Sequence, residues 1–173
     1  MIERVIRRHE PGAEFKEVIT RTAVRAVIRD GGRLLLIRSG KVGDYKFPGG
    51  GLEDGETETE ALAREVLEES GHRVVAVGGA LLRIEELGPA RESPRAAFRM
   101  LSTYYACSVG GGAGAQRLDD YERELGFAAA WIEAGRALEA NRQLLAAGGG
   151  APPPWLGRET LALETLIAAG LAG

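Results

Sequence analysis

Hydrophobic and polar positions first follow a period of two along this chain. Apolar and polar residues alternate over 18–29, a turn signal of Asp-Gly-Gly follows at 30–32, and a second apolar run covers 33–38. Alternation with this period is typical of a strand with one buried face, and a short glycine-containing turn joins two such strands. The pattern therefore predicts a β-hairpin over residues 18–38.

A helical period follows in the segment 58–70. Thr57 and Glu60 have the spacing of a capping box, in which the threonine hydroxyl accepts from the Glu60 amide and the Glu60 carboxylate accepts from the Thr57 amide. Gly71 is the residue type that ends many helices in the left-handed conformation. The segment carries an apolar stripe made of Ala61, Leu62, Ala63, Val66 and Leu67.

The rest of the chain contains further strand-like and helix-like segments. Strands are predicted at 73–86, 98–109 and 127–132, and helices at 133–146 and 158–169. The polar, proline-bearing segment 88–95 is expected to be a loop that overhangs the functional site, which is described below. Residues 110–114 are expected to be a flexible connector, and three prolines at 152–154 interrupt the helical pattern. These elements allow a mixed β-sheet between helices, which is an α/β fold.

Composition agrees with a single domain over residues 1–173. Hydrophobic residues make up 45% of the chain and charged residues 27%, as in ordinary globular proteins. A chain of 173 residues buries roughly 65 to 70 per cent of its unfolded surface, which one core can provide. We therefore expect one domain.

Charge and apolar runs exclude several classes of function. The net charge of -3 gives no broad basic surface, so nucleic acid is not expected as a partner. No apolar run is long enough to span a bilayer, and residues 1–4 lack a signal-peptide core, so we expect a cytoplasmic protein with no membrane partner. The single cysteine, Cys107, is expected to be a core residue on a strand rather than a nucleophile.

Acidic residues are concentrated on one side of the predicted helix 58–70. Glu65, Glu68 and Glu69 stand at i, i+3 and i+4, which places three carboxylates on one face. Arg64 can pair with Glu68 and reach Glu56, but one cation cannot balance four acids. Magnesium prefers oxygen ligands and bridges carboxylates to substrate phosphates. The cluster therefore predicts a magnesium site, with manganese as an alternative, that binds a phosphate.

Two other interpretations of this region are weaker. An acidic helix with merely solvated charges would not need the three successive glycines at 49–51, which let backbone carbonyls approach an ion or a phosphate. A dinucleotide-binding loop fails on spacing, because the third glycine counted from Gly49 and Gly51 would fall on Asp54.

These residues resemble a known family. Gly50, Glu56 and the run 64–71, Arg-Glu-Val-Leu-Glu-Glu-Ser-Gly, fill the charged and glycine positions of the Nudix box, which would cover residues 50 to 72 here. The flanking segments 46–49 and 52–55 are also similar. The one departure is His72, where the family has a bulky aliphatic residue. It affects the packing behind the helix and no metal or catalytic position.

The resemblance implies an α/β/α sandwich and a Mg²⁺-dependent hydrolase of a nucleoside diphosphate linked to another moiety. It implies that Glu65, Glu68 and Glu69 coordinate the metal and that the carbonyl of Gly50 adds a ligand. A bound dication neutralises phosphate charge and lowers the pKa of a coordinated water.

The resemblance also implies supporting and catalytic roles. Glu56 and Arg64 would brace the loop against the helix. Glu65 is the first candidate for the general base, although related enzymes recruit carboxylates outside the box. Here that would be Glu122 or Glu124, which could equally be solvated charges in an acidic turn.

The substrate stays open at this stage. The family acts on oxidised nucleotides, nucleotide sugars such as ADP-ribose, dinucleoside polyphosphates and coenzyme A. A coenzyme A signature would need a threonine and an arginine where this chain has Leu36 and Gly43, and Pro89 is a weak hint of an ADP-ribose hydrolase. Possible stacking surfaces for a nucleobase are Phe98, Tyr104, Tyr105 and Trp131.

Two further alternatives remain. Some members of the family sense nucleotides without cleaving them, usually after losing carboxylates of the box, all of which are present here. Homodimers are common in the family, and the segment before Thr20 is a candidate for the contact between subunits.

Overall fold

The protein is described from a computed structural model. The structure describes residues 1–9, 15–90, 93–111, 114–148 and 152–172. A mixed sheet of seven strands forms its centre: β1 (Ile2–Arg7), β2 (Glu17–Asp30), β3 (Arg33–Ser39), β4 (Tyr45–Lys46), β5 (Arg73–Ala90), β6 (Ser93–Gly110) and β7 (Phe127–Ile132).

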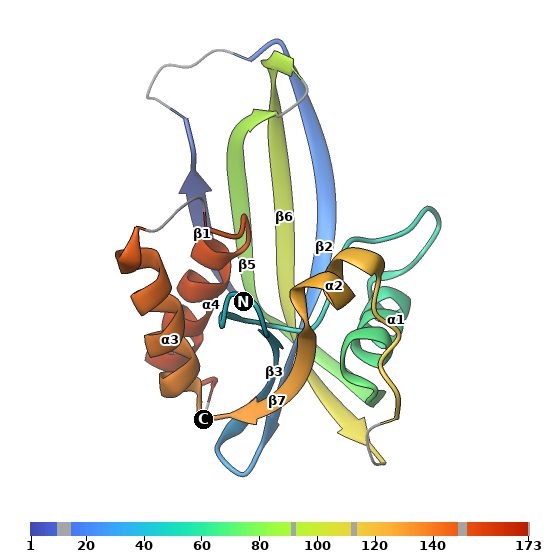
Figure 1. Cartoon of the computed structure of the whole chain (residues 1–173). Helices are drawn as coiled ribbons and strands as arrows, with labels where there is room; N and C mark the ends of the chain where they lie inside the picture. Colours follow the sequence, from blue (N-terminus) through green and yellow to red (C-terminus); the bar gives the residue numbers. More distant parts are fainter. Residues whose placement is uncertain (10–14, 91–92, 112–113, 149–151, 173) are drawn as a thin grey trace.

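The strands run in the order β1-β5-β6-β2-β3-β4, and β7, which is not part of this order, pairs with β3. The pairs β1–β5 and β2–β6 are parallel, whereas β5–β6, β2–β3, β3–β4 and β3–β7 are antiparallel. The strands β2, β5 and β6 form a long blade that extends well beyond the helices (Figure 1).

Helices cover both faces of this sheet (Figure 1). They are α1 (Glu58–Ser70), α2 (Asp120–Leu125), α3 (Ala134–Ala147) and α4 (Leu156–Ala168). The helix α1 packs on one face, and α3 and α4 lie together on the other. The predicted α/β/α sandwich is therefore confirmed. Among the described helices, none is long and apolar enough to cross a membrane.

Two hydrophobic clusters hold the layers together, one on each face. Val24, Ala26 and Ile28 of β2 pack with α1, whereas Val27 belongs to the cluster under α3 and α4. Because successive strand residues point to opposite faces, Arg25 projects on the same face as Val27. This alternation places a charged residue on the α4 side of the sheet.

Most predicted elements are present, some with shifted ends. The helix 58–70 is confirmed with the predicted ends, and the hairpin 18–38 and the strand 127–132 are also found. The last helix begins at Leu156, directly after Trp155, and Cys107 is buried on a strand as expected. Burial raises the pKa of the Cys107 thiol to about 11, which leaves it protonated at neutral pH.

Two predictions differ from the structure. The expected loop 88–95 is wrong, because residues 88–90 end β5 and 93–95 begin β6, with 91–92 outside the described residues. Strand pairing across a long hairpin overrides local proline and glycine signals. The segment before Thr20 contains the strand β1, which pairs with β5 of its own chain, and its contact with a second subunit stays a prediction. The expected turn 119–124 contains the short helix α2, and 112–113 of the expected connector lie outside the described residues.

Candidate active site

Local capping positions the helix that carries the acidic residues. The Thr57 amide donates to Glu60 Oε2 at 2.9 Å, and the Glu60 amide donates to Thr57 Oγ1 at 3.3 Å. At the other end Gly71 has φ 71°, and its amide donates to the Leu67 carbonyl. The capping box and the left-handed glycine therefore define α1 as the sequence predicted.

The glycine turn runs beside β2 and brings its backbone against α1. The amides of Val24 and Ala26 donate to the carbonyls of Gly50 and Pro48 at 2.9 and 2.8 Å. Gly49 has φ 138°, and a Cβ there would overlap the Val24 carbonyl oxygen. A Cβ on Gly50 would overlap the Glu65 carboxylate. The overlap with backbone restricts position 49 to glycine, and Gly50 lies in direct contact with the Glu65 carboxylate.

Arg64 connects the loop to the helix. Its Nε and Nη2 each lie 2.8 Å from an oxygen of Glu56, and Nη2 also donates to the Gly51 carbonyl at 3.2 Å. Its Nη1 lies 2.8 Å from Glu65 Oε1 and 3.4 Å from Glu68 Oε2. Hydrogen bonds from Arg64 lower the pKa of Glu56 to about 2. These contacts are those expected of a brace between loop and helix.

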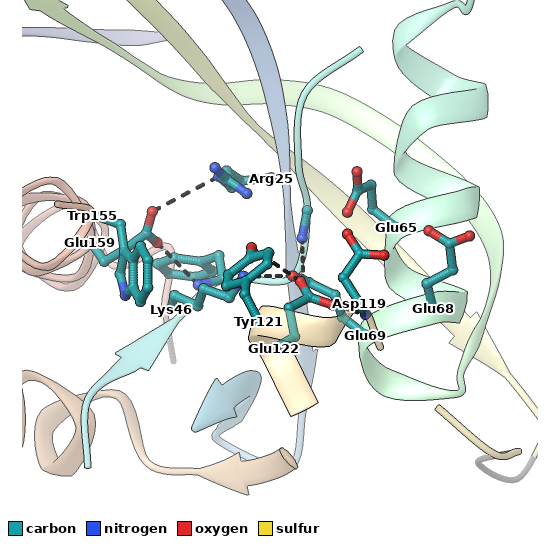
Figure 2. Close-up of polar contacts among 12 residues, drawn as sticks. Arg25, Lys46, Glu65, Glu68, Glu69, Asp119, Tyr121, Glu122, Trp155 and Glu159 are labelled. Atoms are coloured by element: carbon teal, nitrogen blue, oxygen red, sulfur yellow. Dashed lines mark hydrogen bonds and ion pairs between the residues drawn. The ribbon is translucent and has the colours of Figure 1, made fainter. Parts of the chain in front are cut away.

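The carboxylates of Glu65 and Glu68 both contact Nη1 of Arg64. Figure 2 shows Glu65 projecting from α1 toward Arg25, with Glu68 beside it on the same helix. The side chain of Glu65 is 15% exposed and that of Glu68 39%. Burial, followed by the negative charge of Glu69, raises the pKa of Glu65, against the lowering effect of Arg64 and Arg25. A nearby cation would therefore stabilise its ionised form.

Glu69 has a different environment from its two neighbours. It is 2% exposed, one oxygen lies 2.5 Å from Lys46 Nζ, and the other accepts from the Gly49 amide at 2.9 Å. Lys46 itself lies over the ring of Phe127, 4.5 Å from the centroid. Glu69 is thus bound to the strand and turn that precede the box, and a metal would have to replace one of these contacts.

Of the two acidic residues outside the box, only Glu122 points into this region. It is buried, and its Oε2 accepts from the Asp119 amide at 2.9 Å. Burial, and then the charge of Glu69, raise its pKa, whereas the Asp119 hydrogen bond and Lys46 lower it. Glu124 instead makes an exposed ion pair with Lys41 at 3.1 Å. The structure therefore favours Glu122 over Glu124 as a site residue.

The donor set fits a hard divalent cation. Within the residues that the structure describes, no three His, Cys, Asp or Glu side chains lie close enough together to hold an ion by themselves. Magnesium, however, usually takes one or two carboxylates and completes its shell with water and substrate phosphate. Glu65 and Glu68 supply that pair. The Gly50 carbonyl accepts one hydrogen bond, from Val24, and keeps a second lone pair.

A cavity of about 740 Å³ opens beside this acidic region, on the α4 face of the sheet. We call it the arginine cavity because four arginines line it: Arg8, Arg21, Arg25 and Arg158. Its floor is the blade of β2, β5 and β6, where Ile19 pairs with Phe98 and Arg21 with Met100. Trp155, directly before α4, closes one side. A cavity of this size suits a small ligand.

A chain of buried ion pairs fastens α4 to the sheet beside this cavity. Glu86 accepts from Arg8 at 2.7 Å and from Arg158 at 2.8 Å. Arg158 also donates to Glu159 at 3.0 Å. Glu159, which is fully buried, accepts from the Phe47 amide at 3.0 Å and from the Tyr104 hydroxyl at 3.2 Å. The network therefore links α4 to the segment that leads into the glycine turn.

Only one of the four aromatic candidates lines the arginine cavity. Phe98 does so, whereas Tyr104 is fully buried and Tyr105 donates to Glu58 on the α1 face. Trp131 packs edge-on against His72, with 6.1 Å between the ring centroids. His72 is buried behind the helix, as expected. Tertiary structure therefore separates side chains that are indistinguishable as strand aromatics in the sequence.

Sequence reasoning missed Arg25, Trp155 and Glu86. Arg25 is a charged residue inside the apolar stretch 23–28, and this break in the pattern was the available signal. Trp155 follows the three prolines and precedes a helix, without any feature of a site in the sequence. Glu86 and Arg158 are 72 positions apart, so no local pattern could pair them.

The mixed sheet, the glycine turn and the acidic helix together define an α/β protein in which a glycine turn packs against an acidic helix. The family model of the NUDIX domain matches residues 19–148, which is more than half of the chain. The chain therefore belongs to the NUDIX family.

Individual relatives agree with this assignment. The chain is 52% identical to a "MutT-like protein" of Streptomyces ambofaciens over 48 residues, 28% of this chain and 31% of the relative, so the match spans about a third of that relative. A NUDIX hydrolase of Nitrosomonas europaea superposes with a TM-score of 0.56 and 23% identity, over 88% of this chain and 90% of that one. An ADP-ribose pyrophosphatase of Streptococcus suis superposes with a TM-score of 0.50 and 18% identity, over 84% of this chain and 90% of that one. At these identities the two solved structures support the fold alone.

Proposed function

We propose that this protein is a magnesium-dependent diphosphohydrolase, which cleaves a nucleoside diphosphate linked to another moiety and releases a nucleoside monophosphate. The observation that carries the proposal is the contact of Glu65 with the Gly50 backbone, with Glu68 grouped around the same Arg64 nitrogen. This arrangement gathers oxygen donors of the kind that magnesium shares with a phosphate.

Magnesium bound by Glu65, Glu68 and the Gly50 carbonyl would neutralise the diphosphate and lower the pKa of an attacking water. Glu69 would join this set after exchanging its contact with Lys46 or Gly49. Manganese would satisfy the same oxygen donors.

The other residues of the site would position groups and move protons. Arg64, held by Glu56, keeps Glu65 and Glu68 oriented and closes the loop on the helix. Glu65 is the first candidate to accept the proton of the attacking water, and Glu122 is the alternative. Burial raises the pKa of Glu122, and a carboxylate with a raised pKa binds a proton more readily near neutral pH.

A nucleotide derivative is the substrate class that this site supports. A solved structure with the same fold is named an ADP-ribose pyrophosphatase, and a relative in sequence is named MutT-like. Pro89, whose position suggested an ADP-ribose hydrolase, lines the arginine cavity. We include both ADP-ribose-like compounds and oxidised nucleoside triphosphates among the candidates.

A substrate panel tests the proposal. The purified protein is incubated with oxidised nucleoside triphosphates, nucleotide sugars and dinucleoside polyphosphates, with magnesium, with manganese or with EDTA. We expect a nucleoside monophosphate from at least one compound, formed only when a dication is present. Turnover that persists unchanged in EDTA would refute the metal assignment.

A sensing module that binds nucleotides without cleaving them is the second candidate. The binding of Glu69 by Lys46 favours it, because this carboxylate is then not available to an ion. Calorimetry separates the two functions: tight nucleotide binding in magnesium, with no product after several hours, would support the sensing module.

A further inference from the structure

The four arginines of the arginine cavity fall into two pairs. Arg8 and Arg158 share the carboxylate of Glu86, at 2.7 and 2.8 Å, and Arg158 also contacts Glu159. Their charges are therefore compensated within the protein. The other pair is Arg21 and Arg25, which lie four residues apart on the same face of β2.

Arg25 is a buried arginine whose Nε has no hydrogen-bond partner in the described part of the chain. Its side chain is 9% exposed, and the nearest carboxylate oxygen, Oε1 of Glu159, lies 3.9 Å from that nitrogen. That oxygen already accepts from Tyr104 and Arg158. A buried charged donor without an acceptor is costly, and protein interiors seldom contain one. An anionic acceptor from outside would relieve the cost.

Arg21 extends the same positive surface toward the solvent. Its guanidinium lies over Gly51, where a Cβ would come within 2.7 Å of Nη2. Two carboxylates, Glu86 and Glu159, form the ion pairs of the four arginines of this cavity among the described residues, so positive charge is in excess there. This excess would favour an anionic ligand.

The arginine cavity adjoins the proposed metal site. Arg25 lies between Glu159 and Glu65 in Figure 2, and its charge lowers the pKa of Glu65. Arg21 covers the last glycine of the turn whose Gly50 touches Glu65. A substrate with its diphosphate at Glu65 would thus place a neighbouring part of the molecule against Arg25 and Arg21.

Apolar side chains complete the cavity beyond these arginines. The Trp155 indole donates to Asp44 Oδ2 at 2.7 Å and packs edge-on against Phe127 at 6.0 Å, so its ring is fixed in the wall. Phe98 and Met100 form part of the floor. Flat or hydrophobic parts of a ligand would pack on these side chains.

We propose that Arg25 and Arg21 are specificity residues for the reaction above and bind an acidic group of the substrate that lies outside the hydrolysed diphosphate. This inference rests on the proposed function and narrows it: preferred substrates carry an additional phosphate or carboxylate on the moiety that enters the arginine cavity. A nucleoside diphosphate linked to an uncharged sugar would leave the buried guanidinium of Arg25 without an acceptor.

Matched substrates test this preference and identify the acidic group. UDP-glucuronate differs from UDP-glucose by a carboxylate, and NADPH differs from NADH by a phosphate. We expect kcat/KM to be about tenfold or more higher for the acidic member of at least one pair, as a charged hydrogen bond permits. Equal rates within both pairs would overturn the proposal.

Variants assign the effect to the two arginines. Arg25→Met and Arg21→Met should abolish the preference, mainly by raising KM for the acidic compound, and Arg25→Lys should restore part of it. Arg29→Met is the matched control, because Arg29 is an exposed residue of the same strand outside the cavity, and it should retain the preference. Arg21 is also exposed, so Arg21→Met stays informative if Arg25→Met does not fold.

A binding measurement without metal separates this inference from the proposed function. Tripolyphosphate is titrated into the protein in EDTA by calorimetry. We expect saturable binding that weakens about tenfold or more in Arg25→Met and Arg21→Met and is unchanged in Arg29→Met. If this pattern holds without any hydrolysis of the panel, the hydrolase proposal fails and the anion site stands. No binding, or equal binding in all variants, would refute the anion site.

Discussion

Two charged regions meet in this molecule, and they are built in opposite ways. The acidic region around Arg64 comes from one contiguous segment, residues 50 to 72, in which helical spacing sets Glu65, Glu68 and Glu69 and the preceding loop supplies Glu56. The arginine cavity collects charges from Arg8, directly after β1, from the strands β2 and β5, and from Arg158 of α4. The first is therefore visible in a sequence and the second is not.

The two regions also differ in how completely their charges are neutralised. Arg64 is bound by Glu56, Glu65 and Glu68, and acidic charge is in excess around it. In the arginine cavity positive charge is in excess, and Arg25 lacks a hydrogen-bond partner at Nε within the described residues. A dication at one region and an anion at the other would neutralise both, and a metal-bound diphosphate compound with an additional acidic group provides both.

The largest expected effect tests the catalytic side of this comparison. Glu65→Gln should lower kcat by about 10³-fold or more on every active substrate, because it removes a metal ligand and the first candidate for the base. Glu139→Gln, an exposed residue of α3, is the control and should keep full activity. Steady-state kinetics in magnesium provide the measurement. Wild-type rates in Glu65→Gln would show that the acidic region is not catalytic.

A second variant tests the ion pairs that fasten α4. Glu159→Ala should reduce the free energy of unfolding by about 3–5 kcal/mol, because it leaves Arg158 buried without this carboxylate and removes the acceptor of the Phe47 amide. Urea denaturation measures the change. Glu164, also on α4, forms a solvent-exposed ion pair with Arg142 of α3, so Glu164→Ala should cost less than about 1 kcal/mol. Equal losses in the two variants would contradict the importance of burial.

A third variant asks whether the geometry of Arg64 matters beyond its charge. Arg64→Lys keeps the positive charge and loses the two parallel contacts with Glu56, so kcat should fall by about 10- to 100-fold while the protein stays folded. Kinetics and circular dichroism together check this expectation. Unchanged kcat would mean that the two parallel contacts between Arg64 and Glu56 are not needed to orient Glu65 and Glu68.

The smallest expected effect concerns the pair of Arg64 and Glu56, whose contribution to the stability of the fold should depend on pH. The pKa of Glu56 is about 2 in the folded protein against an ordinary 4.5, so folding favours the ionised form. Its contribution to stability is therefore complete above pH 4.5 and is lost as the pH falls toward 2. The urea midpoint of Glu56→Gln should lie below that of the wild type at pH 7, and the gap should narrow at pH 3. A gap of constant size would contradict the pKa argument.

Local sequence determined the acidic region because its geometry follows from bonded neighbours. The capping box, the i, i+3 and i+4 spacing and the glycines require only helical and turn geometry, and the structure has all of them. The same reasoning could not distinguish Glu69 from Glu65 and Glu68. Its burial depends on Lys46, which reaches it from another element.

Elements that depend on distant pairing were harder to predict. The segment 88–95 has the composition of a loop, yet β5 and β6 continue through most of it because each strand satisfies the backbone of the other. Likewise β1 could not be predicted from residues 2–7 alone, since its parallel partner begins more than 60 positions later. Strand pairing is a property of the sheet rather than of the segment.

By itself the sequence determined the family, the α/β class and the position of three carboxylates on one helix face, because motif spacing and hydrophobic period are local properties of the chain. Tertiary structure alone decided that Glu122 is buried whereas Glu124 is exposed, that Trp155 and Phe98 line a cavity, and that Arg25 is buried near Glu65. The physical reason is that burial and charge compensation arise between elements, and only folding brings those elements together.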